Sequence, residues 1–430
     1  MTWVAIKDLK RHIGKEVTVK GWVYNTRASS KNIKFLILRD GSGLLQCVLF
    51  KGETSDDYIN RFDELTQETS VEIIGVVKED ARSVGGVELG VKSFNIIGVS
   101  NDYPITPKEH GTPFLMENRH LWLRSKKQHA IMKVRARTTK AMRDYLDDRG
   151  FICMESPILS ANSCEGTSTL FSCDYFGEQA FLSQSGQLYA EASALAHGKV
   201  YTFGPTFRAE KSKTRRHLTE FWMLEPEMAF YDLDMNMDLI EDFIEHIVKV
   251  VVVDCKSELE TLERDVSKLE CVCKPFPRIS YKEASDILVK ACDDFEVGGD
   301  FGAGHETILS EKFGKPVFVY DFPTAIKAFY FKRSSDPQYV RGCDLLAPEG
   351  FGEIVGGGQR EDSYDELLKR INEHQLNLED YKWYLDLRKY GSVPHSGFGI
   401  GIERTVGWIC GVPHLRETIP FPRMLNNLRP

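Results

Sequence analysis

The chain lacks any hydrophobic run long enough to cross a bilayer, which takes about 20 apolar residues in a row. Its longest apolar stretch, Ile247–Val253, contains Lys249 and falls far short of that length. The first residues, MTWVAIKDLKR, also lack the apolar core of a secretory signal. We therefore expect a soluble protein of the cytoplasm that has no membrane partner.

Cysteine pairs with metal-ligand spacing are absent too. None of the 10 cysteines stands in a C-x-x-C pair, so neither a zinc ribbon nor a disulfide framework is indicated, and we expect reduced thiols. The chain shows no low-complexity tract and no repeat of fixed period. With 430 residues, 42% of them apolar, it is long enough for two or three folded domains.

An excess of basic residues is also missing, because 55 Lys and Arg stand against 63 Asp and Glu and give a net charge of −8. This balance alone argues against a protein that binds nucleic acid by neutralising phosphates. The charges are unevenly distributed, however. Residues 1–50 hold nine basic and three acidic residues, and Arg208–Arg216 holds five basic and one acidic residue. Each patch is compatible with an ordinary solvated face or with a surface for a polyanion.

Residues 16–100 predict a small β-barrel. Five strand-like runs, EVTVKGWVY, IKFLILRD, LLQCVLF, SVEIIGVVKE and VELGVKSFNIIGV, are separated by Gly-containing turns and by a helical interval near residues 56–65. This number and order of strands is typical of an OB-fold, a common binder of single-stranded nucleic acid. We expect this domain at residues 1–102 and a hinge at residues 103–125.

Residues 126–430 predict one large α+β domain. Apolar residues recur at helical spacing in Ala130–Arg149 and Asp238–Val252. Apolar strand-like runs, KVYTFG, PVFVYDF, GEIVGG and SGFGIGI, lie between and after them. Helices of this kind would cover a sheet formed by those strands.

Two segments of this domain suit the binding of a nucleotide triphosphate. Phe207–Phe230 predicts a hairpin whose basic loop could wrap ATP, with Arg208 at the α-phosphate and Phe221 stacked on adenine. In SGFGIGIER, a glycine-rich strand enters a helix where Arg404 could hold the γ-phosphate. This is no Rossmann fingerprint, because Arg stands where the third glycine belongs. The alternatives are a surface hairpin with ion pairs and a glycine-rich core strand.

A third segment, FGEIVGGGQRED, combines an acid and a base around a glycine triplet. Glu353 could hold Mg²⁺ that bridges phosphates, because this ion prefers hard oxygen ligands. Arg360 could hold an anion or a carbonyl group of a substrate. A structural salt bridge is the competing interpretation.

Three motifs in chain order resemble motifs 1, 2 and 3 of the class II aminoacyl-tRNA synthetases: ICMESPILS with Pro157, FRAE with RHLTEF, and GIGIER. The barrel, RHLWLR at 119–124 and FPR at 421–423 resemble their aspartyl, asparaginyl and lysyl subgroup. The likeness covers residues 15–430. It implies an anticodon-binding OB-fold, then an antiparallel catalytic sheet flanked by helices, and a homodimer that pairs through motif 1 around Pro157.

The resemblance also assigns residues to the reaction substrates. It implies that ATP and Mg²⁺ are used, with Arg208 and Arg404 as the catalytic pair. The ATP-binding positions are Arg208, Glu210, Arg216, His217, Leu218, Phe221, Glu353, Gly401 and Arg404. Glu353 is the expected metal ligand, and Asp344 is the alternative second acid because Gly356 replaces a serine found in some relatives.

Further positions match residues that hold the amino acid and the tRNA. Glu165 and Gln187 match the holders of the α-ammonium group, and Arg208 also serves the carboxylate. Arg360 matches the arginine that binds the side-chain oxygen of aspartate or asparagine. In the barrel, Phe35 and Gln46 match positions that stack on and hydrogen-bond the central anticodon base, and stacking is worth about 1–3 kcal/mol per base.

Three departures from the aspartyl pattern favour asparagine as the substrate. The chain reads Ser185-Gly186-Gln187 in place of SPQ, Ala190 in place of Lys, and Glu225 in place of Asp. A carboxamide needs a donor at its oxygen and an acceptor at its nitrogen, which Arg360 and Glu225 would supply. We expect an enzyme that activates L-asparagine with ATP and transfers it to tRNA(Asn).

Three other functions stay open. A non-discriminating aspartyl enzyme would differ only around Ala190 and Glu225. A tRNA-independent ligase that forms asparagine would not need residues 1–100. A regulatory RNA-binding paralogue need not keep Arg208, Glu353 and Arg404 together.

Overall fold

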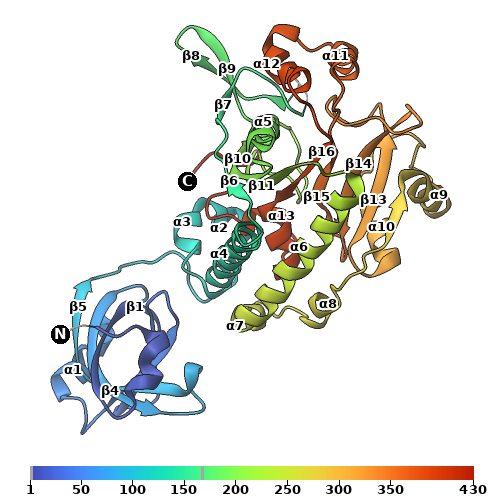
Figure 1. The fold of residues 1–430 in the computed structure, drawn as a ribbon. Coiled ribbons are helices and arrows are strands. Elements are labelled where there is room, and N and C mark those ends of the chain that lie inside the picture. The colour runs from blue at the N-terminus through green and yellow to red at the C-terminus, as the bar shows by residue number, and fades with distance from the viewer. Residues whose placement is uncertain (1–2, 166–168) are drawn as a thin grey trace. The chain divides into compact units, whose positions relative to one another are not determined.

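The computed structural model describes residues 3–165 and 169–430, and the chain forms two compact units, Met1–Thr112 and Pro113–Pro430 (Figure 1). Their boundary falls inside the segment that we expected to be a hinge. Helices α2 (Thr112–Glu117) and α3 (Arg119–Trp122) occupy its second half. Arg119 is buried there, and its Nε and Nη2 donate to carbonyl groups of the C-terminal segment, each at 2.8 Å. These bonds explain why that half is folded into the second unit.

The first unit is a closed barrel of five strands in the order β1-β2-β3-β5-β4. The strands are β1 (Glu16–Ala28), β2 (Ile33–Arg39), β3 (Leu44–Phe50), β4 (Ser70–Glu79) and β5 (Val87–Gly98). Short helical segments connect or precede them: η1 (Ile6–His12), α1 (Asp56–Asn60), η2 (Arg61–Glu64) and η3 (Val84–Gly86). Strands β3 and β5 pair in parallel, and the other neighbours are antiparallel. The predicted five-stranded OB-fold is confirmed.

The second unit is built on an eight-stranded sheet in the order β12-β13-β14-β15-β16-β11-β10-β6. Its strands are β6 (Ile152–Cys153), β10 (Lys199–Phe207), β11 (Glu220–Ala229), β12 (Arg278–Ser280), β13 (Val317–Pro323), β14 (Tyr339–Ala347), β15 (Gly352–Gln359) and β16 (His395–Gly401). The sheet is antiparallel except at its two edges, where β6 pairs with β10 and β12 with β13 in parallel. A smaller sheet contains β7 (Leu159–Ser160), β9 (Glu178–Leu182) and β8 (Ser172–Tyr175).

Helices surround this sheet, as Figure 1 shows. They are α4 (Lys126–Asp147), α5 (Gln187–His197), α6 (Leu233–Asp254), α7 (Lys256–Thr261), α8 (Ser267–Glu270), α9 (Tyr281–Ala291), α10 (Ala303–Phe313), α11 (Tyr364–Glu373), α12 (Leu378–Lys389) and α13 (Ile402–Cys410), followed by the short η5 (Leu415–Glu417). The side chain of Asp232 caps α6 by accepting from the N–H of Met235. Phe243 and Ile247 of α6 belong to the same buried core cluster as Leu224 of β11 and Ile400 of β16.

Two absences bear on the expectations from sequence. Within residues 3–165 and 169–430, no helix combines the length and the apolar character that a membrane span requires. In the structure all ten cysteines are free thiols.

Candidate active site

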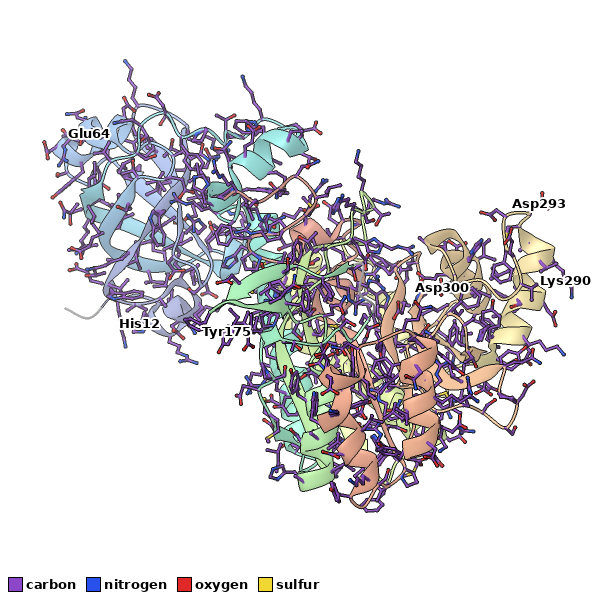
Figure 2. All side chains as sticks on the ribbon, turned by 90° about the horizontal axis from the view of Figure 1, so that it is seen from above. His12, Glu64, Tyr175, Lys290, Asp293 and Asp300 are labelled. Atoms are coloured by element: carbon purple, nitrogen blue, oxygen red, sulfur yellow. The ribbon has the colours of Figure 1, made fainter. Side chains whose placement is uncertain are left out.

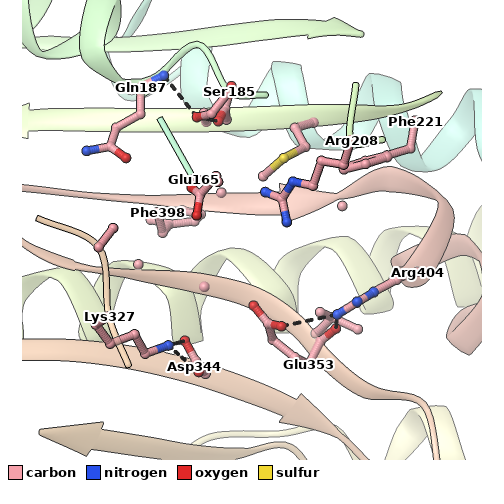
Figure 3. A pocket seen from close by; sticks show the side chains of 18 of the residues that line it. Glu165, Ser185, Gln187, Arg208, Phe221, Lys327, Asp344, Glu353, Phe398 and Arg404 are labelled. Carbon is pink, nitrogen blue, oxygen red and sulfur yellow. Dashed lines mark hydrogen bonds and ion pairs between the residues drawn. The ribbon is translucent and has the colours of Figure 1, made fainter. Parts of the chain in front are cut away.

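A cavity of about 310 Å³ lies against β11, β15 and β16 of the large sheet (Figure 3). It gathers every residue of the second unit that the sequence assigned to ATP, the amino acid or the metal, except Ala190. These lining residues are Glu165, Gln187, Arg208, Glu210, Arg216, His217, Leu218, Phe221, Glu225, Asp344, Glu353, Arg360, Gly401 and Arg404.

The side chains of β11 alternate between the cavity and the core. Phe221, Met223, Glu225 and Glu227 line the cavity, whereas Leu224 is buried among the apolar side chains of the core. Successive side chains of a strand point to opposite faces of the sheet. Glu225 and Glu227 therefore face the cavity, because they lie on the same side of β11 as Phe221.

Arg208 follows the last residue of β10, and its N–H donates to the carbonyl of Thr219 at 3.0 Å. Its guanidinium carbon lies 5.4 Å from the ring centroid of Phe221. Its Nε is buried and has no hydrogen-bond partner among the described residues. Burial lowers the pKa of Arg208, but Glu165 and other nearby carboxylates outweigh this effect and raise that pKa. A buried donor without a partner is costly, so this cation is ready for an anionic ligand.

Arg404 stands in the first turn of α13, directly after β16. Its Nη1 donates to the carbonyl oxygen of Glu353 at 2.7 Å and lies 3.2 Å from Oε2 of the same residue (Figure 3). Burial raises the pKa of Glu353, but the charges of Arg404, Lys327 and Arg208 lower it by more, so that the pKa lies below its ordinary value. Glu353 is therefore an anion within a cluster of cations.

Asp344 of β14 lies opposite Gly356 of β15, and Glu353 lies beside the same glycine. A Cβ atom at position 356 would lie 2.6 Å from Oε1 of Glu353 and 3.5 Å from Oδ1 of Asp344. The absence of a side chain thus keeps a space open between two carboxylates, which are the hard ligands that Mg²⁺ prefers. This donor set fits a magnesium ion.

Lys327 already interacts with one of these two acids. Its Nζ donates to both oxygens of Asp344, at 2.9 and 2.7 Å (Figure 3). Burial nevertheless raises the pKa of Asp344 to about 7 against the opposing charge of Lys327. Glu353 is therefore the more strongly ionised of the two carboxylates.

The basic loop after Arg208 is fixed at its far end by α10. Nη1 of Arg216 donates to Oε2 of Glu306 at 3.0 Å, and its Nη2 donates to Oγ1 of Thr307 at 3.1 Å. Burial and the charge of Arg404 lower the pKa of the neighbouring His217. Arg216 thus has a defined position at the cavity wall, with a neutral imidazole beside it near neutral pH.

Glu225 accepts three hydrogen bonds from the protein. The N–H of Gly186 donates to its Oε2 at 2.8 Å, the hydroxyl of Thr202 donates to the same oxygen at 3.0 Å, and the hydroxyl of Ser185 donates to Oε1. Burial raises the pKa of Glu225, and the three donors oppose this shift. A carboxylate has about four acceptor positions, so Glu225 retains capacity for one further donor.

Arg360 forms a bidentate ion pair with Glu227. Its Nε donates to Oε1 at 3.1 Å and its Nη2 to Oε2 at 2.9 Å, and both side chains are buried. Burial lowers the pKa of Arg360, but Glu227 raises it by more, so the guanidinium stays charged. A bidentate pair fixes the plane of the guanidinium, and Arg360 therefore faces the cavity in one orientation.

A second buried ion pair lies behind this one. Oε2 of Glu191 accepts from Nη2 of Arg388 at 2.6 Å and lies 3.0 Å from Nε2 of His395. Nε2 of Gln187, whose residue lines the cavity, donates to Oε1 of Glu191 at 2.8 Å. The side chain of Gln187 is therefore positioned from the interior.

Glu165 enters the cavity from the SCEGTST loop, whose residues 166–168 lie outside the described residues. Its Oε1 accepts from the hydroxyl of Tyr330 at 3.0 Å, and its N–H donates to Oε1 of Gln184 at 3.0 Å. Glu165, Gln187 and Glu225 together make this end of the cavity rich in acceptors, which suits a cationic or amide group.

Comparison with known proteins supports this description. Residues 111–425 match the family model described as tRNA synthetases class II (D, K and N), and residues 17–97 match the OB-fold nucleic acid binding domain. The chain belongs to the class II tRNA synthetases. The sequence-based resemblance to this family is confirmed.

Several relatives match this synthetase along its whole length. It is 53% identical to an asparagine--tRNA ligase of Sorangium cellulosum, with 99% of each chain covered, and 54% identical to one of Desulforamulus reducens, with 100% of each covered. The crystal structure of asparaginyl-tRNA synthetase from Pyrococcus horikoshii complexed with asparaginyl-adenylate has a TM-score of 0.96 and 43% identity, with both chains fully covered.

Two of the predicted positions in the second unit, Ala190 and Pro157, do not line the cavity of the synthetase. Ala190 is buried on α5 in a small apolar cluster that includes Ala194 and Val200, and it does not line the cavity. Pro157 is exposed after the edge strand β6. The side chain of Ala190 is 1% exposed, and its predicted place among the residues that bind the amino acid stays a prediction.

Phe35 and Gln46 lie on the outer face of the barrel. Leu36 and Leu38 of β2 are buried in the barrel core. Phe35, which precedes Leu36 in the same strand, is only half-buried. Gln46 pairs with Ile37 in register and is half-buried too. Both side chains therefore share one face, and Phe35 is no core residue.

Several residues of the cavity wall were not predicted from sequence, and four of them carry polar or charged groups: Glu227, Lys327, Tyr330 and Asp300. Glu227 carried a usable signal, because it is two positions after Glu225 in a strand and must share its face. Lys327 and Tyr330 stand in an irregular segment after β13, where no periodicity gives the direction of a side chain.

Proposed function

We propose that this synthetase is an asparagine–tRNA ligase. It activates L-asparagine with ATP to asparaginyl-AMP, then transfers the asparaginyl group to the 3′-terminal adenosine of tRNA(Asn), and releases diphosphate and AMP. The identity of 53–54% to curated asparagine--tRNA ligases along the whole chain supports this assignment.

One observation carries the choice of asparagine over aspartate. Arg360 is already neutralised by Glu227, at 2.9 Å, and Glu225 adds a further carboxylate to the same wall. This group of three charges has a net charge of −1. An aspartate side chain would bring a second uncompensated negative charge, whereas a carboxamide is neutral and can donate to Glu225 and accept from Arg360. Like-charge juxtaposition of this kind costs several kcal/mol.

The activation step follows from the two arginines. The asparagine carboxylate attacks the α-phosphorus of ATP, and negative charge develops on the α-phosphoryl oxygens while diphosphate leaves. Arg208, whose Nε is buried without a partner, stabilises that charge. Arg404 holds the γ-phosphate, and the ring of Phe221 stacks on adenine. Other proposed ATP contacts are Glu210, Arg216, His217, Leu218 and Gly401.

The proposed metal ligands are the carboxylates on either side of Gly356. Glu353 is the principal ligand because it is the more strongly ionised, and Asp344 is the second. Bound Mg²⁺ would offset the negative charge of the phosphates. Glu165 and Gln187 hold the α-ammonium group of the amino acid through acceptor oxygens.

The first unit is proposed to bind the anticodon. Phe35 would stack on the central base, and Gln46 would hydrogen-bond it, because both lie half-exposed on one face of the barrel. We further propose a homodimer through the segment around Pro157. Ile152, Ile158 and Leu159 are 45%, 45% and 42% exposed there, an apolar surface that a second copy would cover. We propose that the enzyme works in the cytoplasm, as is usual for a synthetase of this family.

Aminoacylation tests the proposal. Purified enzyme is incubated with ATP, Mg²⁺, a tRNA(Asn) transcript and labelled asparagine, with a tRNA(Asp) transcript as the matched control. We expect asparagine to be attached to tRNA(Asn) and not to tRNA(Asp). Attachment of aspartate to either transcript at an equal rate would contradict the assignment and favour a non-discriminating aspartyl enzyme.

A further inference from the structure

The connection between α9 and α10, residues 292–302, lies at the far edge of the large sheet beyond β12 and β13. Figure 2 shows Lys290 and Asp293 at this outer end of the unit. The connection contains Asp293, Asp294, Glu296 and Asp300 and neither Lys nor Arg. Such a local excess of negative charge attracts cations.

Three side chains of different ligand types converge there. One liganding atom each of Cys292, Asp294 and His305 lies within 4.8 Å of the other two. Nε2 of His305 and Oδ1 of Asp294 are 3.3 Å apart. Bonds of about 2.0–2.1 Å from zinc to nitrogen and oxygen place two ligands of a tetrahedron about 3.3–3.5 Å apart. The imidazole and the carboxylate thus already have the spacing of one edge of a zinc site.

Two of the three ligands are held by helix ends. Cys292 ends α9, where its N–H donates to the carbonyl of Leu288 at 2.9 Å. His305 stands in the first turn of α10, and its ring meets that of Phe295 edge-on with centroids 5.2 Å apart. Ligands on regular elements keep their positions better than ligands on loops. Asp294 is exposed, which leaves room for a water molecule as a fourth ligand.

The imidazole must change its tautomer when it binds a metal. Nδ1 of His305 now accepts from the N–H of Gly302 at 3.1 Å, so that the proton resides on Nε2. Metal at Nε2 moves that proton to Nδ1 and releases the N–H of Gly302. Gly302 is exposed, and water can replace the lost acceptor. The change therefore does not prevent binding.

A second cluster among the described residues, Glu191, Glu227 and His395, has similar spacing but cannot take a cation. Arg388 and Arg360 already form ion pairs with its two carboxylates at 2.6 and 2.9 Å, in a fully buried environment. In contrast, the carboxylate of Asp294 lies beside the thiol of Cys292 and the imidazole of His305, and no Lys or Arg of the described residues forms an ion pair with it. The outer cluster is therefore the one with ligands available.

We propose that Cys292, Asp294 and His305 form a site for a zinc-class divalent cation that fastens the connection between α9 and α10. A thiolate, an imidazole and a carboxylate form a set that favours Zn²⁺ or Co²⁺ over Mg²⁺, which prefers oxygen ligands alone. The site is separate from the proposed Mg²⁺ ligands Glu353 and Asp344. It binds metal whether or not the proposed function is correct.

Cobalt provides the direct test, because a cysteine thiolate bound to Co²⁺ gives a charge-transfer absorption that oxygen ligands do not give. The full chain carrying Cys271→Ser and Cys273→Ser serves as the parent, since those two exposed thiols are possible competitors. After treatment with a chelator, Co²⁺ is titrated and then displaced with Zn²⁺. We expect the band to saturate at one cobalt per chain and to disappear with Zn²⁺.

Single-residue variants test whether the cobalt absorption band comes from this site. Cys292→Ser in the parent should abolish the band, and His305→Gln should weaken cobalt binding at least tenfold. Cys173→Ser, which removes another partly exposed thiol, should change neither. Zn²⁺ should raise the thermal midpoint of the parent and not that of Cys292→Ser. Absence of the band from the parent, or an unchanged band in Cys292→Ser, would overturn the proposal.

Discussion

The backbone N–H of Gly186 donates to Oε2 of Glu225 at 2.8 Å. Proline has no N–H, so a chain that reads Ser-Pro-Gln at 185–187 could not make this bond. A Cβ atom at position 186 would also lie 3.1 Å from the same oxygen and 2.8 Å from Oγ1 of Thr202. Two departures from the aspartyl pattern, Gly186 and Glu225, therefore belong to one arrangement.

Gly186→Pro should weaken the preference for asparagine. The backbone angle φ of −84° at this position is compatible with proline, so the main losses are the hydrogen bond and the space around Glu225. A lost bond to a charged acceptor costs about 1.5–3 kcal/mol, which is about 10- to 150-fold in kcat/KM for asparagine. Pyrophosphate exchange with both amino acids measures it. The control is Gly204→Ala, whose Cβ would meet nothing within 4 Å. An unchanged asparagine-to-aspartate ratio would show that Glu225 is positioned without Gly186.

Arg208→Ala and Arg404→Ala should each lose about 2–3 kcal/mol of transition-state stabilisation in adenylate formation, or about 30- to 150-fold in kcat/KM. The reason is that each removes a fixed donor from phosphoryl oxygens that gain charge. Pyrophosphate exchange at saturating asparagine is the measurement. Arg429→Ala removes an exposed arginine and serves as the matched control. Near-normal exchange in both variants would contradict the proposed roles.

Glu227 and Arg360 should be coupled in stability. Glu227→Met leaves a buried guanidinium unpaired, which costs about 3–5 kcal/mol of unfolding free energy. The double variant Glu227→Met with Arg360→Met removes both charges and should lose less than the sum of the single variants. Urea unfolding measures the cycle. Additive losses would mean that the two side chains, 2.9 Å apart, do not depend on each other.

Phe35→Ala should weaken tRNA binding and leave adenylate formation unchanged. Loss of one stacked base costs about 1–3 kcal/mol, which predicts a KM for tRNA about 5- to 150-fold higher. Ile97→Ala, at a 61% exposed apolar residue of β5, is the control. If charging is normal in Phe35→Ala, the anticodon does not contact this face of the barrel.

Local pattern was sufficient to predict the elements of the barrel and the strands of the cavity. Strand periodicity also places Glu225 on the face of Phe221. It does not give Arg360 as the partner of Glu227, because the two residues stand 133 positions apart and meet only because β11 pairs with β16 and β16 pairs with β15. Long-range register of this kind is set by packing across the whole sheet.

Ala190 and the segment 103–125 also have contacts that the sequence does not reveal. Ala190 matches a position that carries lysine in aspartyl relatives, but its side chain packs into the interior beside Val200. The hinge at 103–125 has no helical periodicity in its sequence, yet Arg119 fixes its second half by bonds to residues 300 and 301 positions later. Neither contact leaves a local signal.

The most direct test of the account is ATP–pyrophosphate exchange by the unmodified chain with asparagine and, separately, with aspartate. The wall formed by Glu225, Glu227 and Arg360 has a net charge of −1, so a carboxylate side chain should be disfavoured by about 2–5 kcal/mol. We predict that kcat/KM for asparagine exceeds that for aspartate by about 30-fold or more. Equal values, or a higher value for aspartate, would contradict the claim that this wall selects asparagine.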